Sequence, residues 1–258
     1  MDKQKKYIYD PIKEANKQCH LLELSSIIPR LRKDIHDRLD NFKYSSEDVI
    51  YLILAIIDIC QFRVGNTKYK NSTGVSTIKC GQIDSNSSNT NISFHGKRQV
   101  INSCQILSGK INKILGTLAE YKDDGDFLFT YVDLNGTTQR VNAENINRLL
   151  STYGNITTKM FRTWKANYYF IKNIKKLELP TNKTGITRNI STAVGATAEK
   201  LYHTKAICRR SYIDSRIVNY YKEDPEMFLE SIRNIKLDNK YLISGEQDLI
   251  RLLGDQCS

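Results

Sequence analysis

The stretch SSEDVIYLILAIIDICQF, residues 45–62, contains the longest apolar run of the chain and predicts a buried helix. Ser45 or Ser46 can cap its first turn, and the two carboxylates that follow lie where the helix dipole favours negative charge. The run is interrupted by Asp58 and is shorter than the roughly 20 residues that a membrane-spanning helix needs. We therefore expect this helix in the core of a globular domain.

The segments that flank this helix predict two more helices and a small sheet. Pro11 allows a helix to begin at Ile12, and another is expected from Pro29 through LRKDIHDRLDN, so that residues 10–62 form a helical subregion. Between residues 65 and 100, short segments rich in β-branched residues are separated by Gly, Asn and Ser. This pattern predicts an antiparallel sheet with an exposed loop at 85–91.

The second half of the chain is expected to be mostly helical. Helical periodicity runs from 103 to 121, and FLFTYV at 127–132 predicts a strand or extended piece. From Asn142 onward helical patterns dominate, with one loop around Pro180. The fold class predicted is α+β, with many helices and a small antiparallel sheet in a single domain over residues 1–258.

Charge and cysteine usage narrow the functional classes. The 39 Lys and Arg residues against 28 Asp and Glu leave a net charge of +11, so nucleic acid, an anionic membrane or an acidic protein could each be a partner. The six cysteines are scattered, with no pair at zinc-ligand spacing, so no metal site is expected. No secretory leader opens the sequence, which predicts reduced thiols in an intracellular compartment.

Five short motifs follow one another in a defined order, and the chain resembles the catalytic domain of type IB DNA topoisomerases through them. The resemblance is to the compact branch found in poxviruses, giant viruses and bacteria, and it covers nearly the whole chain. The motifs are FRVGNTKY at 62–69, FHGK at 94–97, KMFRTW at 159–164, YHT at 202–204 and CRRSYI at 208–213.

The resemblance implies five catalytic residues. Two arginines and a histidine would surround the scissile phosphate, a lysine on a hairpin would act as general acid, and a tyrosine would attack. The matching positions are Arg63, Arg162, His203, Lys97 and Tyr212. Any one of them, taken singly, would have an ordinary structural role, but their joint order and context favour the catalytic interpretation.

Elementary chemistry makes this set sensible. A tyrosine with a pKa of about 10 is a poor nucleophile unless the phosphate is made more electrophilic, which two guanidinium groups and a histidine can do. Lys97 would protonate the departing 5′ oxygen. The product would be a 3′-phosphotyrosine that keeps the bond energy, so the resemblance implies no cofactor, neither ATP nor metal.

Other residues are candidates for holding DNA without taking part in the chemistry. They lie close to the predicted catalytic residues in the sequence, and their alternative role is a solvated basic surface. They are Lys68, Tyr69, Lys159, Arg209 and Arg210. Trp164 is expected to pack in the core rather than to stack on a base.

The chain departs from the family pattern at two points, and two alternative functions also fit the sequence. Arg63 lies only 62 residues from the start, so the amino-terminal β-rich cap domain of the family is expected to be absent, and DNA binding to be weaker and more salt-sensitive. Asn66 stands where poxvirus members tend to have lysine. The alternatives are a tyrosine recombinase, which usually has His-x-x-Arg where this chain has Lys159, and a non-catalytic DNA-binding module.

The expected partner is double-stranded DNA, bound by a monomer without a membrane. Abundant Lys, Asn, Ile and Tyr suggest an AT-rich genome, which fits a large DNA virus. The expected location is intracellular, at a viral replication site or in the virion, or otherwise in the nucleoid or cytoplasm.

Overall fold

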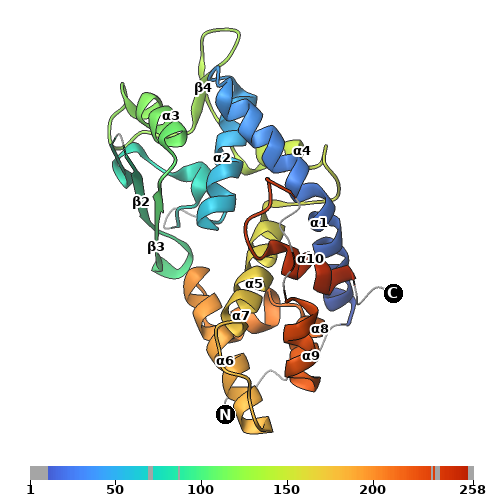
Figure 1. The fold of residues 1–258 in the computed structure, drawn as a ribbon. Coiled ribbons are helices and arrows are strands. Elements are labelled where there is room, and N and C mark those ends of the chain that lie inside the picture. The colour runs from blue at the N-terminus through green and yellow to red at the C-terminus, as the bar shows by residue number, and fades with distance from the viewer. Residues whose placement is uncertain (1–10, 69–71, 87, 234, 236–238, 255–258) are drawn as a thin grey trace.

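The computed structural model describes residues 11–68, 72–86, 88–233, 235 and 239–254 of the chain, without the side chains of 11–18. Figure 1 shows the sheet and most of the early helices in its upper part and most of the later helices in its lower part, with the long first helix running down one side from the upper into the lower part. The helices of the first half are α1 (Pro11–Asp40), α2 (Ser46–Cys60), α3 (Gly109–Ala119) and α4 (Ala143–Leu150). Those of the second half are α5 (Thr158–Ile174), α6 (Lys183–Lys200), α7 (Lys205–Ser211), α8 (Ser215–Glu223), α9 (Pro225–Ser231) and α10 (Glu246–Gly254).

Helix α2 is the buried helix predicted from its sequence. The hydroxyl of Ser45 accepts a bond from the backbone N–H of Asp48 at 3.2 Å, and the Asp48 carboxylate accepts one from the N–H of Ser45 at 3.2 Å. This reciprocal pair satisfies two N–H groups that the helix start leaves unbonded. The helix ends at Cys60 because Gln61 adopts the left-handed conformation, with φ of 54°.

Helix α1 is a single helix, so the prediction of two helices separated at Pro29 is wrong. Proline lacks the N–H that would bond to the carbonyl four residues earlier, and for this reason it usually ends or kinks a helix. Here apolar side chains on both sides of Pro29 are buried in one core, and their burial outweighs the lost bond. They are Leu21, Leu24, Ile28, Leu31, Ile35 and Leu39.

The predicted antiparallel sheet is present, with strand order β1 (Ile83–Ser85), β2 (Thr90–His95) and β3 (Ile101–Ile106). The polar run at 85–91 overlaps both strands, because Ser85 ends β1 while Thr90 and Asn91 begin β2, so the predicted loop was too long. Two local predictions were wrong: residues 75–77 form a 3-10 turn, and helix α3 begins at Gly109, after β3. Pairing with β2 in register, Ser93 opposite Ser103, holds residues 103–106 extended despite their helical periodicity.

The rest of the predicted helix-rich half is confirmed. The run FLFTYV contributes β4 (Thr130–Val132), which pairs with β5 (Thr138–Arg140), a strand that the sequence did not predict. The loop around Pro180 separates α5 from α6. Among the described residues, no helix is both long and apolar enough to cross a membrane.

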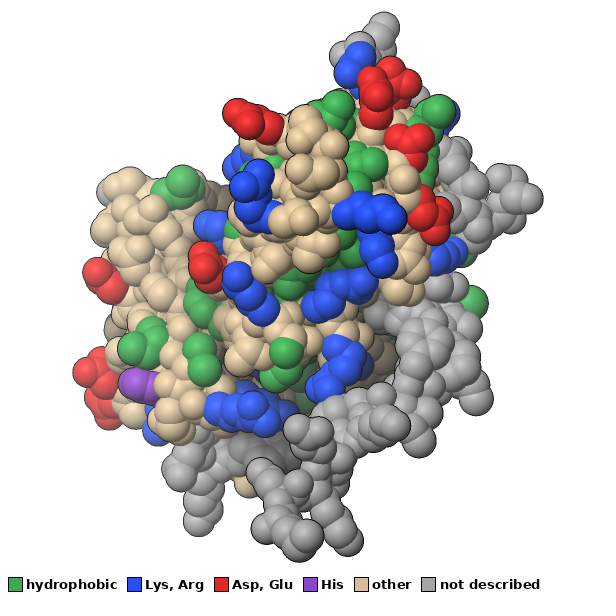
Figure 2. All heavy atoms as spheres, turned by 90° about the horizontal axis from the view of Figure 1, so that it is seen from below, with side chains coloured by type: hydrophobic (Ala, Val, Ile, Leu, Met, Phe, Trp, Pro, Cys, Tyr) green, Lys and Arg blue, Asp and Glu red, His purple; other side chains and the backbone are tan. Residues whose placement is uncertain are grey.

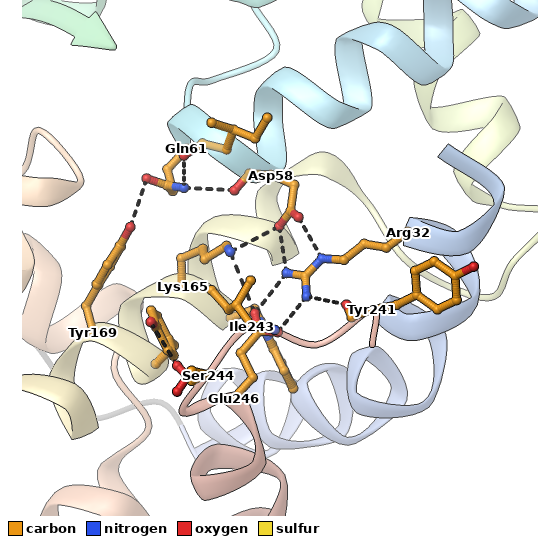
Figure 3. A network of polar contacts seen from close by, with 12 residues as sticks. Arg32, Asp58, Gln61, Lys165, Tyr169, Tyr241, Ile243, Ser244 and Glu246 are labelled. Carbon is orange, nitrogen blue, oxygen red and sulfur yellow. Dashed lines mark hydrogen bonds and ion pairs between the residues drawn. The ribbon is translucent and has the colours of Figure 1, made fainter. Parts of the chain in front are cut away.

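A buried network of charged side chains joins four helices (Figure 3). Arg32 of α1 contacts Asp58 of α2 at 2.7 Å and Glu246 of α10 at 2.5 Å. Lys165 of α5 lies 3.3 Å from Asp58 and 3.6 Å from Glu246. The indole N–H of Trp164, fully buried as expected, donates to Glu246 at 2.8 Å. Two cations thus neutralise two buried carboxylates, which is the condition for keeping charges in a core.

Cys60 and Cys104 form a disulfide, so the expectation of reduced thiols is wrong for this pair. The bond joins the last residue of α2 to β3, two elements that pack against each other. The sequence could not show this because the two cysteines are 44 residues apart and only the docking of the sheet on α2 brings them together. Cys19, Cys80 and Cys208 are free.

Candidate active site

Arg162 lies at the centre of the residues predicted to bind phosphate. It projects from the first half of α5 and is only 2% exposed. Its guanidinium donates to the carbonyl oxygens of Gln61 and Leu201, the latter at 2.6 Å, and contacts Nε2 of His203 at 2.7 Å. These bonds connect the end of α2, helix α5 and the turn after α6, so segments far apart in the sequence meet at one guanidinium.

Tyr212 follows α7 directly and lies against this guanidinium. Helix α7 begins after Thr204, whose hydroxyl accepts from the N–H of Ile207 at 3.3 Å, so the helix places His203 just before its start and Tyr212 just after its end. The two rings stack with centroids 4.4 Å apart, and the guanidinium carbon of Arg162 lies 5.9 Å from the Tyr212 ring. The short helix therefore brings His203 of the YHT motif and Tyr212 of the CRRSYI motif to Arg162.

Burial and neighbouring charge determine the protonation of this cluster. Burial and then the charge of Arg63 lower the pKa of Arg162 to about 10, although Tyr212 opposes the shift. Burial, Arg162 and Arg63 together lower the pKa of His203 to about 3. At neutral pH Arg162 is therefore charged and His203 is neutral.

Two donors in this cluster have no hydrogen-bond partner among the described residues. Because Nε2 of neutral His203 accepts from Arg162, its proton is assigned to Nδ1, and Nδ1 is buried without a partner. The Nε of Arg162 is likewise buried and unpartnered. Buried N–H groups are rarely left unsatisfied, so each of these two donors is suited to an acceptor on a bound anion.

Arg63 belongs to this cluster through its charge, which lowers the pKa values of both Arg162 and His203. It follows the end of α2 and is half-buried, and its carbonyl accepts from the N–H of Val75 at 2.8 Å, which fixes the backbone of the FRVG segment. Lys97 is the exception among the predicted residues. It stands exposed on the turn between β2 and β3, and in the described structure its side chain contacts none of the other four.

The residues predicted to contact DNA have less distinctive surroundings. Lys68 and Arg210 are exposed, Lys159 is exposed in the first turn of α5, and Arg209 is half-buried on α7. Tyr69 lies outside the described residues. Figure 2 shows one face of the molecule on which Lys and Arg side chains gather while most acidic side chains lie toward its edges. This face therefore carries positive charge that a polyanion could cover.

Comparison with known proteins agrees with this geometry. Residues 6–238 match the family model described as "Eukaryotic DNA topoisomerase I, catalytic core". The DNA topoisomerase 1B of Acanthamoeba polyphaga mimivirus is 30% identical over 254 residues, covering 91% of this chain and 74% of the relative. The DNA topoisomerase 1 of Rabbit fibroma virus is 26% identical, with 91% of this chain and 69% of the relative covered. The chain belongs to the type IB DNA topoisomerase family.

The vaccinia virus (strain Copenhagen) DNA topoisomerase 1B is a further similar protein, 27% identical over 212 residues, which cover 77% of this chain and 62% of the relative. Membership of the topoisomerase family makes this chain an enzyme of the isomerase class that acts on DNA. The recombinase alternative is not favoured by these relatives.

Asn167 is a residue of this topoisomerase that sequence reasoning missed. It is fully buried on α5, and its side-chain amide donates to the carbonyl of Tyr212 at 3.0 Å and to that of Thr163 at 2.8 Å. Its side-chain oxygen accepts from the N–H of Asp214 at 2.7 Å. Asn167 thus holds the backbone on both sides of Ile213. The only sequence signal was a polar residue on a helical face otherwise rich in aromatic and apolar residues.

Proposed function

We propose that this topoisomerase cleaves one strand of duplex DNA through attack by Tyr212, allows the duplex to swivel, and then rejoins the strand. The observation that carries the proposal is the pair of unpartnered buried donors, Nδ1 of His203 and Nε of Arg162, beside the Tyr212 ring. A phosphodiester oxygen is an anionic acceptor that would satisfy both donors.

Each residue has a role that follows from its surroundings. Arg162 and Arg63 place two positive charges where a pentacoordinate phosphate would gain negative charge. His203 would donate from Nδ1, since its low pKa keeps it neutral and its Nε2 accepts from Arg162. Attack by the Tyr212 oxygen would form a 3′-phosphotyrosine and release the 5′ oxygen, which Lys97 would protonate from the hairpin turn. Religation reverses these steps, with the 5′ hydroxyl as nucleophile.

For this chemistry, Lys97 would have to approach the DNA bound at the site, because in the described structure it stands on an exposed turn and contacts none of the other four residues. A turn at the end of two paired strands can enter a groove of the duplex while its base stays fixed. The other basic residues, Lys68, Lys159, Arg209 and Arg210, would bind phosphates next to the cleavage site, and we extend this role to Tyr69. We expect the protein to act as a monomer at the replication site of a virus-infected cell, since the relatives are viral proteins.

The experiment compares Tyr212→Phe with the wild-type protein on supercoiled plasmid in EDTA and on a denaturing gel of labelled DNA. The wild type should relax the plasmid and form a covalent adduct, and Tyr212→Phe should do neither. Tyr220→Phe is a matched control, because within the described part of the chain the Tyr220 hydroxyl of α8 bonds only to the Met227 carbonyl of α9, at 3.4 Å. Adduct formation by Tyr212→Phe, or its absence from the wild type, would show the proposal to be wrong.

A further inference from the structure

Tyr202, the residue before His203, connects the turn that carries the histidine to the sheet that carries Lys97. Its hydroxyl donates to the carbonyl of Ser103 on β3 and accepts from the N–H of Ser103 at 3.1 Å. Strand β3 is at the edge of the sheet, so these two backbone groups face away from β2. One tyrosine hydroxyl thus satisfies both backbone groups of a single edge residue.

The backbone of Tyr202 is arranged for this contact. Its φ of 55° lies in the left-handed region, which non-glycine residues seldom adopt and which must be held by other contacts. The ring of Tyr202 lies 6.5 Å from that of Phe62, and Phe62 contacts Phe94 of β2 edge-on at 4.7 Å. The hydroxyl and the ring together fix a conformation that the backbone alone would not favour.

These three aromatic residues each stand close in sequence to a predicted catalytic residue. Phe62 precedes Arg63, Tyr202 precedes His203, and Phe94 lies three residues before Lys97. The ring contacts therefore join the three segments that must converge on one phosphate, and the Tyr202–Ser103 bonds attach the strand that leads away from the Lys97 turn. Ser103 is two residues from Ile101, where the ladder of the hairpin ends.

We infer that Tyr202 is a positioning residue that holds the Lys97 hairpin in register with the His203 turn, so that the lysine reaches the leaving oxygen of the phosphate bound by Arg63, Arg162 and His203. The inference rests on the proposed function and deepens it. It assigns Tyr202 no contact with DNA. Because the hydroxyl acts on the hairpin, its loss should affect protonation of the leaving group and leave DNA affinity unchanged.

The test uses two DNA substrates that differ in the leaving atom. In one the 5′ leaving atom is oxygen, and in the other it is a bridging sulfur, which leaves as a thiolate and needs little protonation because thiols have a pKa near 8.5. Tyr202→Phe keeps the ring and removes the hydroxyl. We expect single-turnover cleavage of the oxygen substrate to slow by roughly tenfold, a fraction of what a general acid contributes, and cleavage of the sulfur substrate to stay within about twofold of wild type.

Controls separate positioning from folding. Tyr220→Phe, which loses a tyrosine-to-backbone bond elsewhere, should cleave both substrates as the wild type does. Tyr202→Gly removes the ring and the hydroxyl, but glycine adopts a positive φ without strain. Slower cleavage of the oxygen substrate by this variant could therefore not be attributed to backbone strain. The amide of Ser103 should exchange with solvent faster in Tyr202→Phe than in the wild type, a readout that does not depend on activity.

The outcomes distinguish this inference from the proposed function. If the wild type forms no adduct with either substrate, the proposed function fails. If the wild type cleaves and sulfur rescues Lys97→Ala, but Tyr202→Phe equals the wild type on both substrates, the function stands and the inference is overturned. A Tyr202→Phe defect of the same size on both substrates also overturns it, since a general loss of structure would slow both.

Discussion

Replacement of Asn167 by alanine should damage the Tyr212 loop more than the fold as a whole. The substitution removes the acceptor of the Asp214 N–H and the donor to the Tyr212 carbonyl, bonds of 2.7 and 3.0 Å in a fully buried place. A buried polar group left without a partner costs about 1–3 kcal/mol, so two such groups should lower the free energy of unfolding by about 2–6 kcal/mol.

The catalytic effect of the same substitution follows from geometry. With the backbone on both sides of Ile213 released, the Tyr212 oxygen should lose its alignment with the phosphate. A displacement of about 1 Å costs roughly a hundredfold in rate. The rate of covalent adduct formation should be measured in a single turnover with saturating DNA, at a temperature where urea unfolding shows the variant to be folded.

Asn189→Ala provides the matched control for this prediction. Asn189 is also a buried asparagine on a helix, and its amide donates to the Glu178 carbonyl at 2.9 Å and to the Tyr221 hydroxyl at 3.0 Å. Its loss should destabilise the protein to a similar extent without slowing cleavage by the folded fraction. The reasoning would be refuted by equal cleavage rates for the two variants, whether both were slow or both were as fast as the wild type.

Three further predictions concern stability. Burial alone would raise the pKa of Asp58, but the charges of Lys165 and Arg32 outweigh it and lower this pKa from 3.8 to about 2. Ionised Asp58 therefore adds about 2 kcal/mol to the free energy of unfolding above pH 4. This contribution is lost as the pH falls from 3.8 toward 2. Acid unfolding followed by circular dichroism should show a shallower fall in Asp58→Asn, and an unchanged pH dependence would contradict this assignment. Ser45→Ala should lower the free energy of unfolding in urea by about 1 kcal/mol, with Ser88→Ala, in an exposed turn, as the neutral control; equal stability of the two would contradict the cap. Alkylation of the unfolded, unreduced protein should leave Cys60 and Cys104 unlabelled until a reductant is added, and labelling of both residues before reduction would exclude the disulfide. Cys104→Ser should lower the free energy of unfolding by about 4 kcal/mol, as expected for a closed loop of this length.

The sequence by itself predicted most elements whose causes are local. The cap at Ser45 and the apolar run that follows it were sufficient for α2, because capping and burial depend on residues close together in the chain. The five motifs and their order pointed to the family, and the match over residues 6–238 confirms that family. The roles of the five residues stay predictions, supported by the contacts among Arg162, His203 and Tyr212 and by the charge of Arg63 acting on the first two.

The tertiary structure decided what depends on contacts between distant segments. Helix α1 continues through Pro29 because the core on both sides holds it, and residues 101–106 are a strand because β2 pairs with them. Three of these contacts join residues far apart in the sequence: Asn167 and Tyr212 are 45 residues apart, Tyr202 and Ser103 are 99 apart, and Cys60 and Cys104 are 44 apart. Their partners are chosen by packing, which no local pattern encodes. The sequence therefore determined which residues could do the chemistry, and the packing of α5, α7 and the sheet decided which others hold them in place.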